Sequence, residues 1–200
     1  YRFLPVKAEN YIEGVGGVDE RKTYDMYMNK CQWGNLKEPG VYVDRESMRN
    51  SIIPKQNFMR TARALVDRGE NEKAIRLLDK CLVEFPDDKI PYDMYMIPFI
   101  EVYYDAGAPE QANAITERVF EIYNQNMKYY YRLDDQLAKY YETEYNRTLG
   151  VMQQLSMMAR ANRQDALYEA IDSTFSEYLK TMPKAGIITF SCQPALLFYR

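Results

Sequence analysis

The sequence predicts an all-α protein in which helical hairpins stack on one another. Apolar residues recur at the three- and four-residue spacing of amphipathic helices between residues 55 and 180. Two segments, 65–82 and 102–120, also repeat the same order of large, glycine and small positions, with Gly107 following Gly69 by 38 residues. A repeat of this length is typical of helical solenoids, in which each hairpin buries its apolar face against the next.

Glycine and alanine mark the turn and the packing interface of each expected hairpin. Gly69 lies five residues before Ala74, and Gly107 lies five residues before Ala112. A glycine just after a helix can adopt positive φ and so end that helix. The small alanine lets the second helix pack close to the first. We therefore expect each second helix to begin two residues after its glycine.

A less regular third hairpin is expected at the end of the stack. It comprises one long helix from about Asp134 to Arg160, a turn at Asn162 and Arg163, and a helix over residues 165–180. Terminal units of a solenoid commonly depart from the repeat. We therefore predict that this hairpin caps the stack.

The two ends of the chain do not follow the repeat, which divides the sequence into three parts. Residues 1–54 are expected to form a mixed helical and extended segment that packs on the helical repeats of residues 55–180, and residues 181–200 an irregular tail. Because the chain starts at Tyr1 without a leader, we expect it to be a piece of a longer protein.

For the N-terminal segment, the sequence predicts two helix caps, an extended stretch and a tryptophan anchor. Asp19 and Asp44 precede short helical stretches and are expected to be their N-caps. Residues 41–43 are expected to be extended. Trp33, the one tryptophan of the chain, is interpreted as a buried anchor of this segment, with an exposed sugar-binding platform as the alternative.

Composition argues against several classes of function. The net charge of −3 and the pI of about 5.2 do not fit a nucleic-acid-binding surface. No apolar run approaches the roughly 20 residues of a membrane-spanning helix. The chain has no histidine, and its three cysteines lack a zinc-binding spacing. We therefore predict no catalytic residue, metal ion or cofactor, and it stays open whether Cys31 and Cys81 form a disulfide.

Two pairs of neighbouring acids are interpreted as helix caps. Asp87 and Asp88 form one pair, and Asp134 and Asp135 form the other. Both pairs precede expected helices, where negative charge is favourable. Metal binding or acid–base chemistry is the alternative.

The first helices of successive hairpins are expected to line a concave face that can hold an extended peptide. The candidate binding residues on this face are Gln56, Met59, Arg63, Asp67, Ile97, Glu101, Tyr104 and Asp105. Of these, Gln56, Arg63, Asp67, Glu101 and Tyr104 are the principal candidates for contact with a ligand. A solvated helix face without a ligand is the alternative.

Tyrosines are concentrated between residues 127 and 145, which suggests a second candidate site. Tyr130, Tyr141 and Tyr145 follow the apolar stripe of the expected helices and are predicted to pack one hairpin against the next. The off-stripe candidates for contact with a ligand, such as a glycan, are Tyr129, Tyr131 and Tyr140.

The first repeat resembles the tetratricopeptide (TPR) motif. When Ala74 is aligned with the small position of the motif, the other residues of the repeat that match the motif are Ala62, Leu65, Gly69, Cys81 and Pro86. The second repeat keeps the large, glycine and small positions but has Asn124 in place of the proline. The resemblance implies a TPR-like interaction module rather than an enzyme.

Several sequence blocks together resemble a second family. "YRFLPVK", "TYDMYMNKCQWGN", "VYVDRESMR", "ALVDRGENEKAIRLLDKC" and "IPFIEVYYDAG" are similar to the C-terminal region of a large bacterial multi-pass membrane protein family. That family is related to an animal transmembrane protein O-mannosyltransferase. The resemblance covers roughly residues 1–180 and implies a location on the periplasmic face of the inner membrane, with the catalytic acid in an upstream membrane region.

The resemblance implies a protein or peptide partner, such as the acceptor polypeptide of a membrane glycosyltransferase. Attachment to the membrane would come from the upstream region. A carbohydrate-contacting domain that uses the exposed tyrosines and a purely structural or oligomerisation cap are the alternatives.

Overall fold

The computed structural model describes residues 16–180, except for the side chain of Asp135. The expected tail over 181–200 and the "YRFLPVK" block lie outside the described residues. Residues 16–180 form helices joined by turns and loops, without a β-strand, and this confirms the prediction of an all-α protein. The helices are α1 (Glu20–Asp25), a π-helical turn η1 (Met26–Lys30), α2 (Arg45–Asn50), α3 (Ile52–Asp67), α4 (Asn71–Glu84), a 3-10 turn η2 (Met94–Met96), α5 (Ile97–Asp105), α6 (Pro109–Tyr130), α7 (Asp135–Tyr140), α8 (Glu142–Ala161) and α9 (Asp165–Lys180).

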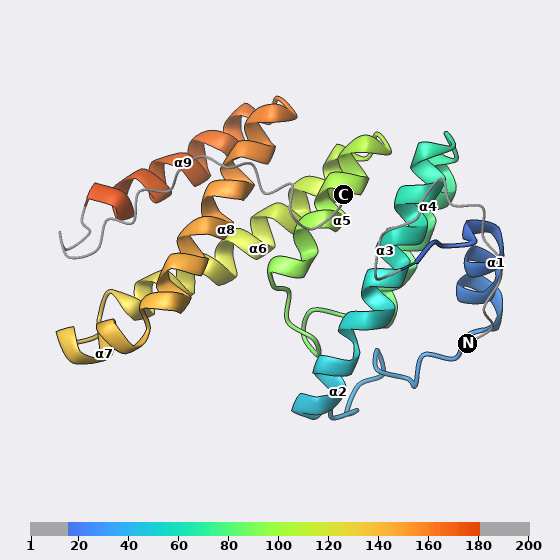
Figure 1. The fold of residues 1–200 in the computed structure, drawn as a ribbon, viewed down its shortest axis with the longest axis horizontal. Coiled ribbons are helices and arrows are strands. Elements are labelled where there is room, and N and C mark those ends of the chain that lie inside the picture. Colours follow the sequence, from blue (N-terminus) through green and yellow to red (C-terminus); the bar gives the residue numbers. More distant parts are fainter. Residues whose placement is uncertain (1–15, 181–200) are drawn as a thin grey trace.

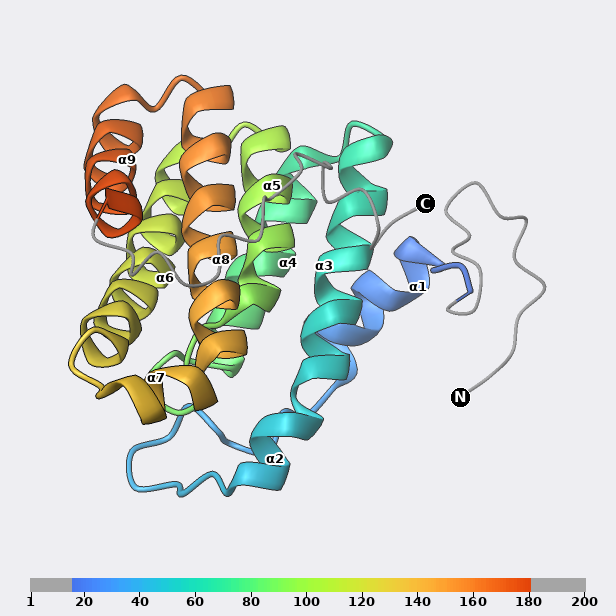
Figure 2. The ribbon, with the colours of Figure 1, turned by 60° about the vertical axis from the view of Figure 1, so that its left-hand side comes forward.

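The longer helices form three hairpins that follow one another along the chain: α3 with α4, α5 with α6, and α8 with α9 (Figure 1). Figure 2 shows α3, α5 and α8 in one layer, with α4 and α6 behind them and α9 beside α8 at the left edge. Helix α3 packs against α5, whereas α8 packs mainly against α6 and α9. The second helices of the first two hairpins begin at Asn71 and Pro109, as the sequence predicts.

A left-handed turn closes the first hairpin. Gly69 has a φ of 76°, a conformation that glycine adopts without steric cost. The amide of Gly69 donates to the carbonyl of Val66 (2.8 Å), and the amide of Glu70 donates to that of Leu65 (2.9 Å). These two bonds form a Schellman motif, which satisfies the last carbonyls of α3.

The other two hairpins close in the same way. Gly107 and Arg163 have φ values of 81° and 57°. The amides of Ala108 and Gln164, each one residue further on, donate to carbonyls five residues back at 2.9 Å. The third turn therefore has the same geometry but carries an arginine, whose side chain makes positive φ unfavourable.

Small residues lie where the helices of a hairpin meet. Ala62, Ala74 and Ala112 are all fully buried, which confirms the close packing that the repeat predicts. A hydrogen bond then joins the first two hairpins, because the buried Tyr103 of α5 donates from its hydroxyl to Asp79 Oδ1 of α4 (2.8 Å).

An aromatic cluster attaches the N-terminal segment to the first hairpin. The Trp33 ring packs against Tyr27, Phe58 and Phe85, with centroid distances of 5.2, 4.9 and 5.6 Å. Clusters of this kind contribute both buried area and edge-to-face attraction. Trp33 therefore anchors the segment, as predicted, although its side chain is only partly buried.

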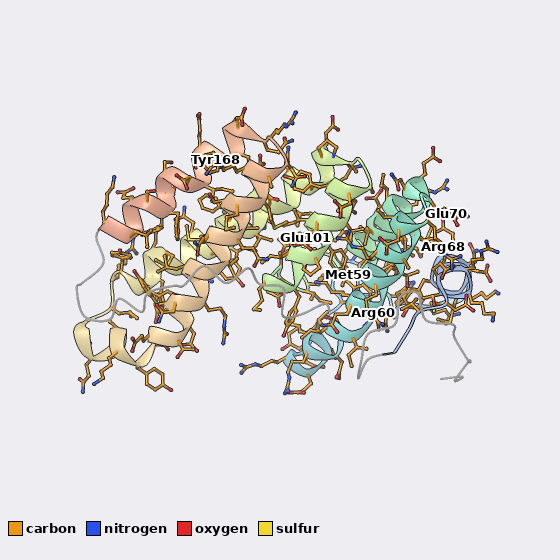
Figure 3. All side chains as sticks on the ribbon, turned by 45° about the horizontal axis from the view of Figure 1, so that its top comes forward. Met59, Arg60, Arg68, Glu70, Glu101 and Tyr168 are labelled. Carbon is orange, nitrogen blue, oxygen red and sulfur yellow. The ribbon has the colours of Figure 1, made fainter. Side chains whose placement is uncertain are left out.

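Polar contacts fix the ends of the same segment. Arg68, at the end of α3 beside α1 (Figure 3), forms a 2.7 Å ion pair with the buried Glu20. Asp19 caps α1 and Asp44 caps α2, each by accepting a backbone amide hydrogen bond, as predicted. Residues 41–43 form no strand; they run as an irregular segment in which Val43 is buried and Tyr42 is exposed.

The predicted single helix from Asp134 to Arg160 is wrong. The chain forms α7, turns at Tyr141 (φ −95°, ψ 13°) and continues as α8. No glycine or proline marks this break. The Tyr141 ring packs against Tyr130 at 5.9 Å, so contact with the preceding hairpin, rather than local sequence, holds the turn. A single helix would place Leu137 on the same face as Tyr141 and Tyr145, whereas it is 46% exposed in α7.

Replacement of Gly69 by alanine is expected to lower the free energy of unfolding by about 1 kcal/mol. The added Cβ meets no atom within 4 Å, so the cost arises from positive φ and not from a clash. Urea unfolding followed by circular dichroism measures the change.

Two control substitutions distinguish backbone strain from a general effect of mutation. Gly150→Ala, inside α8 with open space around its Cβ, is expected to stabilise by about 0.5–1 kcal/mol. Arg163→Gly is expected to stabilise by a similar amount, because it removes a side chain from a left-handed turn. Equal destabilisation by all three substitutions would contradict this account of the turns.

Candidate functional site

The predicted concave face lies where α3 and α5 run side by side. Arg63 of α3 forms ion pairs with Glu101 (3.9 Å) and Asp105 of α5. Met59 and Ile97 are buried beneath it, and Figure 3 shows Met59 on α3 close to the helix that carries Glu101. Partial burial raises the pKa of Glu101, with Arg63 opposing this change and Asp105 adding to it. Three of the predicted polar and charged groups thus join the two helices.

Tyr104 of the predicted face points into a polar network between hairpins. Its hydroxyl donates to Asn113 Oδ1 (2.6 Å), and Asn113 Nδ2 donates to Gln164 Oε1 (2.8 Å). Burial raises the pKa of Tyr104. The network connects α5 and α6 to the turn between α8 and α9, so the principal role of Tyr104 is structural.

Gln56 and Asp67 are the predicted face residues whose side chains form no hydrogen bond or ion pair with the described residues. Gln56 is half-buried near the start of α3, and Asp67 is exposed at its end. The α3–α5 face therefore presents polar groups at its two ends and an ion-paired centre.

A cavity of about 210 Å³ lies next to Gln56, where α2, the start of α3 and the loop before α5 converge. Its lining combines cations, one acid and apolar side chains. The lining residues are Arg45, Met48, Arg49, Ser51, Ile52, Lys55, Gln56, Ile90, Pro91, Asp93, Tyr95 and Phe99.

Lys55 is the unusual member of this lining. It is only 6% exposed, and a buried ammonium normally requires an ion-pair partner. Its Nζ lies 5.7 Å from the centre of the Tyr92 ring, and no ion pair joins it to the described residues. Burial lowers the pKa of Lys55, against the attraction of Asp93 and Asp87.

Sequence reasoning overlooked Lys55, although a signal exists. Residues 55, 58, 62 and 65 follow one face of α3, and the last three are the fully buried Phe58, Ala62 and Leu65. Lys55 occupies the remaining position of this stripe, where the pattern calls for an apolar side chain. The same lysine lines the cavity.

The tyrosine cluster lies where α6, α7 and α8 meet. The ring of Tyr130 packs against Tyr141 (5.9 Å) and Tyr145 (6.4 Å), and burial raises the pKa of Tyr145. These contacts confirm that Tyr130, Tyr141 and Tyr145 pack the second hairpin against the third.

The three off-stripe tyrosines differ in their surroundings. Tyr131 is held by α9, since its hydroxyl donates to the carbonyl of Tyr178 (2.8 Å) and its ring packs on the Tyr178 ring (5.3 Å). Tyr129 and Tyr140 are 53% and 79% exposed and both lie against Tyr141. Tyr129 and Tyr140 are thus the rings of this cluster that offer free area.

The paired acids divide between two roles. Asp134 caps α7 by accepting from the amides of Gln136 and Leu137, as predicted. Asp87 does not cap a helix: it accepts from the amide of Tyr92 (2.7 Å) and from Arg118 Nε (2.6 Å), and so ties the loop before α5 to α6.

Other candidate chemistry is sparse in the part of the chain that the structure describes. Residues 16–180 contain no group of three or more acids and cysteines arranged to hold a metal ion. Cys31 and Cys81 are free thiols, and burial raises the pKa of Cys81. None of the helices within the described range is long and apolar enough to cross a membrane.

Comparison with known proteins yields no relative. No protein-family model matches the chain, and no match is found among curated proteins or solved structures.

Replacement of Lys55 by methionine is expected to stabilise the protein near neutral pH, on the order of 1 kcal/mol. Because the folded-state pKa of Lys55 lies below the ordinary 10.5, the unfolded chain binds this proton more tightly. The cost of charging Lys55 is therefore complete below its folded-state pKa and is lost as the pH rises from that pKa to 10.5. Urea unfolding at several pH values from neutral upward measures the difference.

The exposed Lys128 of α6 provides the matched control. Lys128→Met removes the same charge from a solvated position, and we expect almost no change in stability at any of these pH values. A Lys55→Met advantage that stays constant with pH would mean that improved packing, and not the buried charge, causes it.

Proposed function

We propose that this chain is a TPR-like, non-catalytic interaction module that holds a partner or acceptor polypeptide. We further propose that it is the periplasmic C-terminal domain of a membrane-embedded glycosyltransferase-like protein, as the sequence resemblance implies. The observation that supports the binding role is the surface shared by α3 and α5. There, two consecutive hairpins place their first helices side by side.

The contacts of this surface suit an extended peptide. Arg63, Glu101 and Asp105 fix the centre of the surface by ion pairs across the two helices. Gln56 and Asp67, near opposite ends of α3, leave an amide and a carboxylate for polar groups of a ligand.

The TPR-like assignment is supported by the geometry of the turns. Both complete repeats close at a glycine with positive φ and bury an alanine five residues later. The spacing of 38 residues exceeds that of the motif because of the loop and 3-10 turn before α5, which contain Pro91 and Met94–Met96.

The double variant Gln56→Ala/Asp67→Ala, in the full-length protein, is expected to lower the rate of acceptor modification about threefold to tenfold. Neither side chain is bonded to the described residues, so the fold should be retained. The measurement is the initial rate of glycan transfer to acceptor polypeptides in membranes that contain the protein.

Gln111→Ala/Glu117→Ala is the matched control, because it removes an exposed amide and carboxylate from α6 in the other layer. We expect this control to retain the wild-type rate. If the Gln56/Asp67 variant also retains that rate while its unfolding midpoint is unchanged, the α3–α5 face does not bind the acceptor.

A carbohydrate-contacting role is the second candidate, and the exposure of Tyr140 favours it. Its ring is 79% exposed and packs edge-on against Tyr141 at 5.3 Å, so it is both open and supported. Exposed aromatic rings of this kind can stack on sugars. A structural or oligomerisation cap remains the third proposal.

Under the carbohydrate hypothesis, Tyr140→Ala is expected to weaken binding of a mannose-containing oligosaccharide by about tenfold. NMR titration of this chain measures the shifts of residues in α7. Tyr42→Ala, a similarly exposed tyrosine in the N-terminal segment, is the control. No chemical-shift change at millimolar oligosaccharide would rule this hypothesis out.

A further inference from the structure

The cavity between α2, α3 and the loop before α5 carries more positive than negative charge. Arg45, Arg49 and Lys55 contribute three cations to its lining, against one carboxylate from Asp93. Glu46, outside the lining, pairs with Arg49 at 3.3 Å and offsets part of that charge. One positive charge therefore remains without a compensating acid in this group of residues.

Asp93 is itself occupied by the backbone. Its Oδ1 accepts from the amide of Tyr95 (2.9 Å) and so caps the 3-10 turn before α5. Burial raises the pKa of Asp93, although Lys55 opposes that shift. No direct ion pair joins Asp93 to Lys55, which is 6% exposed.

A cation at a core position without an ion pair is unfavourable for folding. The Lys55 stem could be replaced by an apolar side chain of similar length, yet a lysine is kept in the lining of the cavity. An anion that enters the cavity would supply the missing counter-charge in surroundings where water screens it little.

The remaining lining sets the size and character of the ligand. Apolar side chains form much of the wall: Met48, Ile52, Ile90, Pro91, Tyr95 and Phe99. The volume of about 210 Å³ lies below the roughly 300–1,000 Å³ of pockets for drug-sized ligands. A ligand that fits is small and has an apolar body as well as an anionic group.

We propose that this cavity binds a small amphiphilic anion, with its carboxylate or phosphate held by Lys55, Arg45 and Arg49 and its apolar body against the wall. This site is separate from the peptide-binding role proposed for the α3–α5 face, although Gln56 borders both. It holds whether or not that role is correct.

Benzoate and benzamide test the proposal, because they share a shape and differ in charge. Amide NMR titrations are run at constant ionic strength, and the cross-peaks of Lys55, Ile90 and Asp93 are followed. We expect saturable shifts with benzoate in the millimolar range and binding at least about tenfold weaker for benzamide. Inorganic phosphate is expected to shift the same peaks more weakly, since it lacks an apolar body.

Three variants assign the effect to the cavity. Lys55→Met is expected to weaken benzoate binding about tenfold or more, and Arg45→Gln about threefold. Arg45 is exposed, so its replacement tests the site even if the core variant alters the fold. Lys128→Met, at an exposed position of α6, is expected to bind benzoate like the wild type.

Several results would overturn the proposal. Benzamide binding as tightly as benzoate would show an apolar cavity without anion selectivity. If sodium chloride produced the same shifts as sodium benzoate, the effect would be a general one of ionic charge. Shifts that persist unchanged in both Lys55→Met and Arg45→Gln would lead to the same conclusion. The absence of saturable benzoate shifts at these three residues would show that the cavity binds no such anion.

Discussion

The left-handed turn that closes each hairpin is the constraint on which the rest of the structure depends. At Gly69, Gly107 and Arg163 a single residue of positive φ reverses the chain, and two backbone hydrogen bonds end the first helix. The turn fixes the residue at which the second helix begins. Each residue added to a helix rotates the next side chain by about 100°, so a turn of different length would move Ala74 or Ala112 out of the hairpin interface.

The N-terminal segment completes the first hairpin and builds the cavity beside it. Trp33 packs on Phe58 and Phe85, which holds the segment against α3 and α4. Helix α2 then lies at the start of α3, near the loop before α5, and Lys55 is enclosed among them. Local departures from an otherwise consistent core pattern commonly mark functional sites, where stability is given up for binding. Lys55 is the clearest departure of this kind in the described structure.

The junction between the second and third hairpins is made differently. Partly buried tyrosine rings pack there against buried aliphatic side chains, and Tyr130 contacts both Tyr141 and Tyr145. Polar contacts continue the junction: Tyr104, Asn113 and Gln164 form one hydrogen-bonded chain, and Tyr178 donates to Asn124 Oδ1 at 2.6 Å. Such bonds are directional, and they fix the orientation of the third hairpin where aliphatic packing alone would allow sliding.

The sequence by itself determined the helical class, the two glycine turns, the starts of α4 and α6 and the caps at Asp19 and Asp44. Each of these depends on residues close together in the chain, through periodicity, backbone conformation or a local hydrogen bond. Only the tertiary structure decided the break at Tyr141, the binding of Asp87 to Arg118 and the ion pairing of Arg63. These features depend on groups brought together from separate hairpins, and no local pattern states which distant side chain will supply the partner.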